Sequence, residues 1–390
     1  MFDFIYFLML FFLYLDNIGF FFLLDFFFSF CLFLFSLVFY FLMKLLSNDR
    51  ISWLLSIMLS LISFNFFFCW SMINFIVFFE LSSMMVIIMA LIFGIQVEKI
   101  NSFYYFFFYN LISFLPFFFL MIYFMKSMII LNLIFLNFFM DYFYMFFSLL
   151  VFFVKFPLFF FHFWLPKIHV EASTFSSMLL ASLLLKFGVF GLYRFLFLLK
   201  YNFFLVFFYI FFFGLIISLL ICLSQSDLKS QIAYSSVSHM SVVFFNLIIF
   251  SSIMEKYSFL VTLGHAFSSC LSFWLVGEIF YSCQSRLVME VNSFFLSNNK
   301  FSFLFTLMLM LLGSFPFSLS YFTEFYMIYI FSKNFFFMWF FIWFFFFDLF
   351  FVMFLMTLIY FGKKYKKVNS MMYMNLSLLI FWSYNFFFYL

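Results

Sequence analysis

Long apolar segments separated by short polar breaks run through nearly the whole chain. A helix needs about 20 apolar residues to cross the hydrocarbon core of a bilayer. Cutting the sequence at its polar breaks predicts about thirteen transmembrane helices, near residues 2–15, 24–45, 51–69, 73–92, 102–124, 143–166, 172–198, 203–223, 230–250, 257–282, 303–331, 336–361 and 371–389. The first of them is short for a span, and the segment 126–141 is predicted to lie at the membrane interface. The pattern indicates an all-α polytopic membrane protein.

The order of these helices contains an internal symmetry. The third to seventh helices and the eighth to twelfth form two sets of five, and the fourth member of each contains a proline, Pro157 or Pro316. Proline removes a helix hydrogen bond and clashes with the preceding turn, so both helices are expected to break. Because five is an odd number of membrane crossings, the two sets have inverted topology. Matching broken helices in inverted halves point to a transport site near the midplane of the membrane. Two prolines can also match by chance.

This symmetry predicts a domain order. It consists of amino-terminal transmembrane helices at 1–50, a first antiporter-like five-helix repeat at 51–198, a second such repeat at 203–361 and a carboxy-terminal helix at 371–390.

Composition strengthens the membrane assignment and suggests a source. The chain is 69% hydrophobic and 8% charged, with a mean hydropathy of +1.27, which excludes a soluble globular domain. Its 92 phenylalanines exceed what core packing needs and favour T-rich codons in an AT-rich organellar genome. The amino end has no basic region, cleavage site or Arg-rich amphipathic segment, which fits synthesis inside the organelle.

Several chemistries have no support in the sequence. The five cysteines never approach CxxC spacing and the four histidines show no metal-ligand pattern, so neither an iron–sulfur cluster nor a zinc site is expected. No P-loop or GxGxxG motif indicates nucleotide binding. Loop lysines and arginines divide 11 against 5 between the two predicted sides, so the net charge of +4 reports topology rather than nucleic-acid binding.

Three charged residues interrupt the predicted helices of the first repeat: Glu80, Lys155 and Lys186. A charge at the centre of a bilayer helix costs about 2.5 to 3.5 kcal/mol on insertion scales, so such residues usually mark an ion or proton path. An isolated buried carboxylate protonates or finds a cation, and the two lysines are the candidate cations for Glu80. Such a pair can relay protons. The alternative is a static ion pair that fixes helix packing.

The second repeat contains further candidates. His239 and His265 lie in adjacent predicted helices, and imidazole titrates closest to neutral pH, so either can shuttle a proton or act only as a structural donor. Glu324 follows Pro316 by eight residues, about 12 Å along a regular helix, and is the candidate last group before an exit. Asp348 either extends this series of candidate proton-carrying groups or makes an interhelical hydrogen bond. Lys229, at the start of a serine-rich helix, is interpreted as structural.

Specific motifs place these residues in a known context. They are FFE ending at Glu80, K-x-P from Lys155, HFWLPKIHVEAS at 162–173, LLLKFGVFGLYR at 183–194 and SDLKSQIAYSSVSHM at 226–240. On these motifs the chain resembles the chain 4 family of mitochondrial NADH-ubiquinone oxidoreductase, respiratory complex I. The resemblance covers roughly 25–361 and separates the chain from the related chains 2 and 5.

The resemblance implies an antiporter-like subunit that conducts protons from the matrix to the intermembrane space. The implied polar axis consists of Glu80, Lys155, Lys186, His239, His265 and Glu324. The family has no redox cofactor on this chain, since NADH, FMN, iron–sulfur clusters and ubiquinone belong to other subunits. Its expected neighbours in the mitochondrial inner membrane are other membrane-arm subunits, chains 2 and 5 among them, and lipids.

Three features depart from the family pattern. One transmembrane helix is expected to be missing at the amino end, Ser173 stands where a proline follows HVEA, and Asp348 replaces a neutral polar residue. Two other functions stay open at this point. One is a free-standing cation/proton antiporter on the same ancestral fold, and the other is a purely structural arm subunit whose buried charges only set packing.

Overall fold

In the computed structural model the described part of the chain is helical throughout its regular elements, as predicted. The structure describes residues 29, 36, 50–69, 71–94, 96, 98–127, 142–196, 204–248, 252–291, 299–315, 318–331 and 335–360. Within these residues the regular elements are helices, and an isolated β-bridge joins Asp227 to Leu287. The predicted helices at 2–15 and 371–389, nearly all of that at 24–45 and most of the interfacial segment 126–141 lie outside the described residues.

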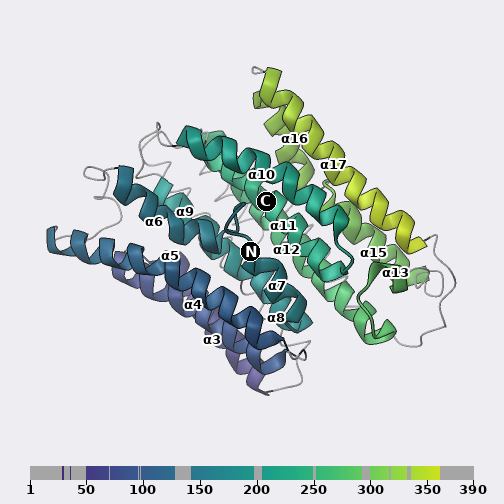
Figure 1. Ribbon diagram of the computed structural model, residues 1–390, viewed down its shortest axis with the longest axis horizontal. Coiled ribbons are helices and arrows are strands. Elements are labelled where there is room, and N and C mark those ends of the chain that lie inside the picture. The colour runs from purple at the N-terminus through teal and green to yellow at the C-terminus, as the bar shows by residue number, and fades with distance from the viewer. Residues whose placement is uncertain are drawn as a thin grey trace, which may run out of the picture. The chain divides into compact units, whose positions relative to one another are not determined.

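Figure 1 shows the order of the helices. They are α3 (Arg50–Phe67), α4 (Met72–Phe93), α5 (Lys99–Ser127), α6 (Tyr142–Lys155), α7 (Trp164–Glu171), α8 (Thr174–Leu179), the π-helix η2 (Leu180–Leu184), α9 (Leu185–Leu196), α10 (Phe204–Ser224), α11 (Leu228–Ile248), α12 (Ser252–Cys283), α13 (Val288–Val291), α15 (Asn299–Leu312), α16 (Leu319–Phe331) and α17 (Phe335–Tyr360).

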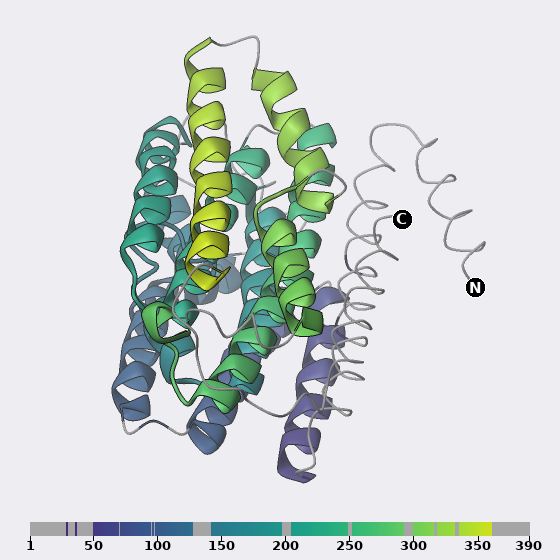
Figure 2. The ribbon, with the colours of Figure 1, turned by 90° about the vertical axis from the view of Figure 1, so that its right-hand side faces the viewer.

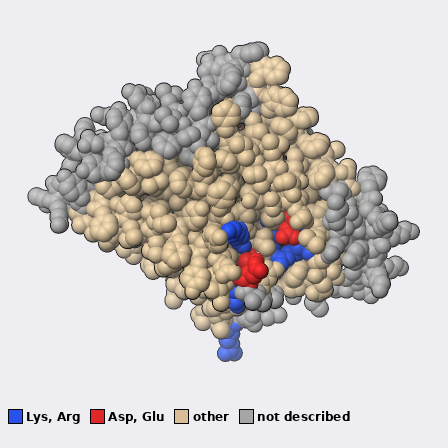
Figure 3. Space-filling model, in the orientation of Figure 1, with Lys and Arg blue, Asp and Glu red and all other residues tan. Residues whose placement is uncertain are grey.

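Five helical segments in the described part of the chain are long and apolar enough to cross a membrane. They are Arg50–Phe67, Ile73–Phe93, Lys99–Ile122, Thr174–Phe195 and Lys256–Cys283. One face of α5 carries exposed apolar side chains, with Phe108 56%, Ile112 72% and Phe119 66% exposed. A continuous exposed apolar stripe is suited to lipid. Figure 3 shows a largely uncharged face on which most of the visible charged atoms gather in one area. The chain is a multi-pass membrane protein, and the count of thirteen helices stays a prediction.

The chain divides into two compact units, one formed by Met1–Met85 with Asn375–Leu390 and the other by Val86–Met374. In the first unit the Phe66 ring lies 4.9 Å from the Phe75 ring and 5.8 Å from the Phe79 ring, so α3 packs on the start of α4 through aromatic side chains. These units are not the predicted five-helix repeats, whose boundaries stay a prediction.

The core of the second unit is built around α11. This helix packs against α7, α10 and α12, while α12 also contacts α15 and α16 (Figures 1 and 2). Every residue of α11 from Leu228 to Leu247 is buried except Tyr234. Its serines, among them Ser235 and Ser238, donate their hydroxyl hydrogens to carbonyls three residues earlier, which satisfies the buried hydroxyls inside the helix. Small side chains let neighbouring helices approach closely.

The predicted break at Pro157 is confirmed. Helix α6 ends at Lys155, Pro157 lies in the turn that follows, and α7 begins at Trp164. The Trp164 indole Nε1 donates to the Val154 carbonyl at 2.9 Å, which gives a partner to one of the carbonyls at the end of α6. Phe160 within this connection has a φ of 76°.

A second interruption lies between α15 and α16. Helix α15 ends at Leu312, α16 begins at Leu319, and Ser314 between them has a φ of 49°. Pro316, the residue predicted to cause this break, lies outside the described residues.

A polar cluster joins three helix ends at or just beyond the ends of the predicted spans. Lys229 Nζ donates to the Ala172 carbonyl at 2.8 Å, and the Arg286 guanidinium donates to the Val170 carbonyl. The backbone N–H of Leu228 donates to the Arg286 carbonyl at 3.1 Å. These bonds fasten the end of α7 to the start of α11 and the end of α12. Lys229 and Arg286 were predicted to lie on the same side of the membrane, and the structure places them together.

Close backbone packing holds α9 against the end of α6. A Cβ on Gly188 would lie 2.8 Å from the Phe156 backbone nitrogen and 3.0 Å from the Lys155 carbonyl carbon. Only glycine fits such a contact without a shift of the backbone. Gly188 is two residues after Lys186, so this contact sets the separation between the two helices that carry the lysines.

Replacing Gly188 with alanine should lower the yield and thermal midpoint of the detergent-solubilised protein, because backbone atoms cannot rotate away from the new methyl group. Overpacking a buried contact costs about 1 to 3 kcal/mol. Gly313→Ala is the matched control, since its one contact below 3.0 Å is with Cγ2 of Val352, which rotation of that side chain can relieve, and it should cost less. A Gly188→Ala variant as stable as the wild type would contradict the close packing.

The environment of Lys229 predicts a pH dependence. The side chain is 4% exposed, and burial together with the positive charge of Arg286 lowers the pKa of Lys229 to about 7, against the opposing effect of Glu171. Between pH 7 and the ordinary lysine pKa of 10.5, the unfolded chain holds a proton that the folded chain lacks. Stability should therefore rise with pH in this window, by at most about 1.4 kcal/mol per pH unit.

Lys229→Met should remove this contribution. We expect the thermal midpoint of the variant to rise less steeply between pH 7 and 10 than that of the wild type. Lys167→Met serves as the control, because Lys167 is exposed and should leave the wild-type slope unchanged. Equal slopes for the Lys229 variant and the wild type would show that the buried lysine does not change its protonation on unfolding.

Candidate functional site

Five ionisable side chains from five helices gather in the interior of the second unit. They are Lys186 on α9, His265 on α12, His239 on α11, Glu324 on α16 and Asp348 on α17, and each is at most 4% exposed. Ionisable side chains are rarely buried so completely unless they are paired, and inside a membrane protein they usually serve a transport path. Four of the five were predicted as relay residues, and the role of Asp348 was left open.

Lys186 lies just after a π-helical turn. Residues Leu180–Leu184 form this turn, and Lys186 Nζ donates to the Ala181 carbonyl at 2.8 Å. The wider turn of a π-helix changes the i→i−4 bonding pattern, and such turns are frequent at functional sites. Nothing in the sequence LASLL signals it, because the segment contains neither proline nor glycine. The turn gives the buried ammonium group a backbone partner.

Lys186 also contacts the first histidine of the cluster. Its Nζ lies 3.1 Å from His265 Nδ1, which is hydrogen-bonding distance. The His265 and His239 ring centroids are 5.8 Å apart, and His265 Nε2 has no hydrogen-bond partner among the described residues. A proton can therefore be shared directly between Lys186 and His265, and the second ring lies one step further on.

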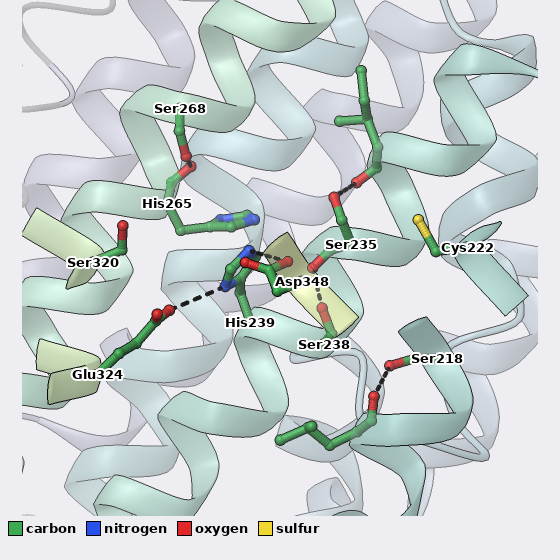
Figure 4. Close-up of polar contacts among 12 residues, drawn as sticks. Ser218, Cys222, Ser235, Ser238, His239, His265, Ser268, Ser320, Glu324 and Asp348 are labelled. Atoms are coloured by element: carbon green, nitrogen blue, oxygen red, sulfur yellow. Dashed lines mark hydrogen bonds and ion pairs between the residues drawn. The ribbon is translucent and has the colours of Figure 1, made fainter. Parts of the chain in front are cut away.

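His239 lies between two carboxyl groups (Figure 4). Its Nδ1 is 3.8 Å from Glu324 Oε1, and its Nε2 is 3.8 Å from Asp348 Oδ1. Both distances are about 1 Å longer than a hydrogen bond. His239 Nε2, Glu324 Oε1 and Asp348 Oδ2 have no hydrogen-bond partner within the described structure. Leaving a buried polar atom unsatisfied costs about 1 to 3 kcal/mol, so three of them together call for a functional explanation.

Serines surround this group without competing for its protons. The hydroxyls of Ser235, Ser238 and Ser268 each donate to a carbonyl three residues earlier in their own helix. Figure 4 shows Ser235 and Ser238 near Asp348, and Ser320 and Ser268 on the side of Glu324 and His265. These four serines thus make the surroundings polar, but they do not titrate.

Lys155 lies at the end of α6 and is 1% exposed. Its backbone packs directly against Gly188 of α9, and Pro157 follows in the helix break. The structure therefore brings the Lys155 backbone to the helix that carries Lys186, and the predicted axis through both lysines stays a prediction.

Glu80 lies in α4, within the first compact unit, and is half-buried. Ser83 Oγ lies 2.7 Å from the Glu80 carbonyl and 3.4 Å from Glu80 Oε2, so the serine binds mainly to the backbone. The pairing of Glu80 with either lysine stays a prediction.

Sequence analysis did not assign a role to two buried histidines in the motif HFWLPKIH. His162 and His169 are both 0% exposed, and neither ring nitrogen of either residue has a hydrogen-bond partner among the described residues. The His169 ring stacks on Phe273 with centroids 4.4 Å apart, and the His162 ring stacks on Phe159 and Phe163. The motif itself was the signal that could have identified them.

A sequence model of one protein family matches residues 69–352. Its description is NADH:quinone oxidoreductase/Mrp antiporter, transmembrane. The chain is also 39% identical over 172 residues to NADH-ubiquinone oxidoreductase chain 4 of Caenorhabditis elegans, and 40% identical over 172 residues to that of Ascaris suum. In both cases the match covers 44% of this chain and 42% of the relative, so it spans less than half of their length.

Solved structures share the fold. Respiratory complex I from Thermus thermophilus with bound NADH contains a chain that matches with a TM-score of 0.80 and 18% identity, over 92% of this chain and 79% of that one. A chain of the Mrp complex from Dietzia sp. matches with a TM-score of 0.77 and 14% identity, over 88% of this chain and 66% of that one. Because the family match extends over well more than half of the sequence, the chain belongs to the transmembrane family of NADH:quinone oxidoreductase and Mrp antiporter subunits.

Proposed function

We propose that this chain is a proton-translocating membrane-arm subunit of respiratory complex I. It would couple NADH oxidation and ubiquinone reduction on other subunits to proton pumping across the mitochondrial inner membrane. The family match, the names of the nematode relatives and the motif resemblance support this assignment. The arrangement of Lys186, His265, His239 and Glu324 is the single observation that carries the mechanism.

The proposed relay begins at Lys186. Two nitrogen bases 3.1 Å apart cannot both hold a proton without strong repulsion, so protonation of one favours release from the other. Lys186 would pass a proton to His265 Nδ1, His265 would pass one from Nε2 toward His239, and His239 would deliver it from Nδ1 to Glu324. The 3.8 Å gap between His239 and Glu324 closes by a side-chain adjustment of about 1 Å, so this step can open and close the path.

Lys155 and Glu80 would control the relay from its entry. Lys155 is joined to the Lys186 helix through Gly188, and a charge change at Lys155 alters the electrostatic cost of a proton on Lys186. Pairing and separation of Glu80 and Lys155 would then set when Lys186 gives up its proton. The breaks at Pro157 and near Pro316 would supply the local freedom for these motions.

The rest of the proposal concerns the cofactors, the neighbouring subunits and lipids, and the genome that encodes the chain. We propose that the chain holds no redox cofactor, with NADH, FMN, iron–sulfur clusters and ubiquinone on other subunits. The neighbours would be other membrane-arm subunits, chains 2 and 5 among them, and inner-membrane lipids, and the chain would be encoded in the organelle. The Phe-rich composition and the lipid-suited stripe on α5 support the last two points.

Structural likeness to the Mrp complex favours a second candidate, a free-standing cation/proton antiporter. Native electrophoresis of mildly solubilised membranes separates the two. Peptides from residues 283–302 should co-migrate with the band that stains for NADH dehydrogenase activity. Migration as a small species without that activity, with sodium-dependent transport by the isolated protein, would favour the antiporter.

Lys186→Met should uncouple pumping from electron transfer. The variant keeps most of the length of the side chain and removes the amine that carries the proton, so the number of protons moved per NADH should fall while NADH oxidation continues. The measurement is proton uptake per NADH in vesicles that contain the assembled complex. Lys167→Met is the control, because Lys167 is exposed and lies outside the relay. Unchanged protons per NADH in Lys186→Met would favour the purely structural role for the buried charges.

A further inference from the structure

Asp348 is the one member of the buried cluster whose role sequence analysis left open. Its Oδ1 lies 3.8 Å from His239 Nε2, the same distance that separates Glu324 Oε1 from His239 Nδ1. The side chain is 2% exposed and Oδ2 has no hydrogen-bond partner in the described part of the chain. Within the described residues, no hydrogen bond therefore holds Asp348 Oδ2 in place.

The two carboxyl groups beside the His239 ring come from different helices. Glu324 comes from α16, which follows the second helix interruption, whereas Asp348 comes from the long helix α17. Both helices contact each other, and Figure 2 shows them side by side. Each ring nitrogen thus faces a carboxyl group from a different helix. The ring can therefore exchange a proton at one nitrogen while the other nitrogen stays beside its carboxyl group.

Charge balance limits how this group can be occupied. Two carboxylates buried around one imidazole cannot both ionise at low cost unless the ring is protonated, because like charges in a low-dielectric interior repel. An imidazolium neutralises one carboxylate and leaves the second as the acid or as an uncompensated charge. The three groups therefore hold protons as a unit rather than one at a time.

We infer that Asp348 is a second proton-accepting carboxylate of the relay, exchanging its proton directly with His239 Nε2. In this step the Nε2–H bond of the imidazolium breaks, an O–H bond forms on Asp348 Oδ1, and the carboxylate becomes a neutral acid as the ring becomes neutral. The reverse step returns the proton to Nε2 and re-forms the imidazolium, and Nδ1 then delivers its own proton to Glu324 while Nε2 stays protonated, so the ring is never an anion. Asp348 thereby supplies the Nε2 proton that lets Nδ1 discharge to Glu324 without rotation of the ring. This inference rests on the proposed relay function.

The test compares protons moved per NADH in vesicles containing the assembled complex. Asp348→Asn should lower the ratio to a value between wild type and Lys186→Met, while NADH oxidation per assembled complex stays unchanged. Combining it with Glu324→Gln should bring the ratio down to the Lys186→Met level. Asp348→Glu keeps the acid and should restore most of the ratio. A purely structural role would lower the amount of complex and leave the ratio intact.

Asn246→Ala is the matched control. Asn246 is a fully buried polar residue on α11 whose amide atoms have no hydrogen-bond partner among the described residues, and it cannot titrate. It should leave the ratio unchanged. If Asp348→Asn does not assemble, Asp348→Ser is measured instead, since a hydroxyl suits the serines nearby.

The outcomes separate this inference from the proposed function. A wild-type ratio in Asp348→Asn, with a reduced ratio in Lys186→Met, overturns the role of Asp348 alone. Wild-type ratios in both variants overturn the relay itself. A lowered ratio in Asp348→Asn that Asp348→Glu restores supports the second carboxylate.

Discussion

The contact between Lys186 and His265 is the interaction on which the rest of the site depends. Two proton-binding nitrogens lie 3.1 Å apart in an interior where both side chains are at most 4% exposed. Desolvation makes a charge costly there, and the second nitrogen makes a second charge costlier still. A group of this kind binds one proton and responds to any charge brought near it, which is the property that a coupled proton path requires.

Two local features of the backbone, a π-helical turn and a close helix–helix approach at a glycine, lie next to the residues of this contact. The π-helical turn gives Lys186 a carbonyl partner at Ala181, and Gly188 lets the end of α6 approach the same helix. Serines along α11 bond their hydroxyls to their own helix, so these hydroxyls add no unpaired group to a helix that is buried on nearly all sides. The exposed apolar face of α5 is suited to lipid. The polar centre and the lipid-suited surface are therefore two results of the same arrangement.

Much of this arrangement follows from the sequence because a membrane restricts it so strongly. Apolar length predicts helices, and charges inside apolar segments have to face the protein interior. Lys186, His239, His265 and Glu324 could therefore be identified as candidates from the sequence, before the structure showed that they lie close together. Pro157 ends a helix as predicted. Pro116, however, lies inside α5 without ending it, so proline alone does not locate a break.

Other features required the three-dimensional structure. The π-helical turn at Leu180–Leu184 has no local sequence signal. The position of Asp348 beside His239 depends on how α17 packs on its neighbours, which apolar periodicity does not encode, since α17 is hydrophobic almost all round. His162 and His169 were visible in the sequence, but their stacking on phenylalanine rings and their unpartnered nitrogens emerge only from packing.

If the cluster relays protons, its buried side chains change protonation during turnover. Infrared difference spectroscopy of the assembled complex in membranes, triggered by NADH and quinone, reports this directly through the carbonyl band of a protonated carboxylic acid and the ring bands of histidine. A proton relay through the cluster should give a carboxylic acid band that shifts in deuterium oxide and is lost in Glu324→Gln, together with histidine bands that are lost in His239→Gln. Turnover spectra of the wild type and both variants that coincide in these regions would contradict it.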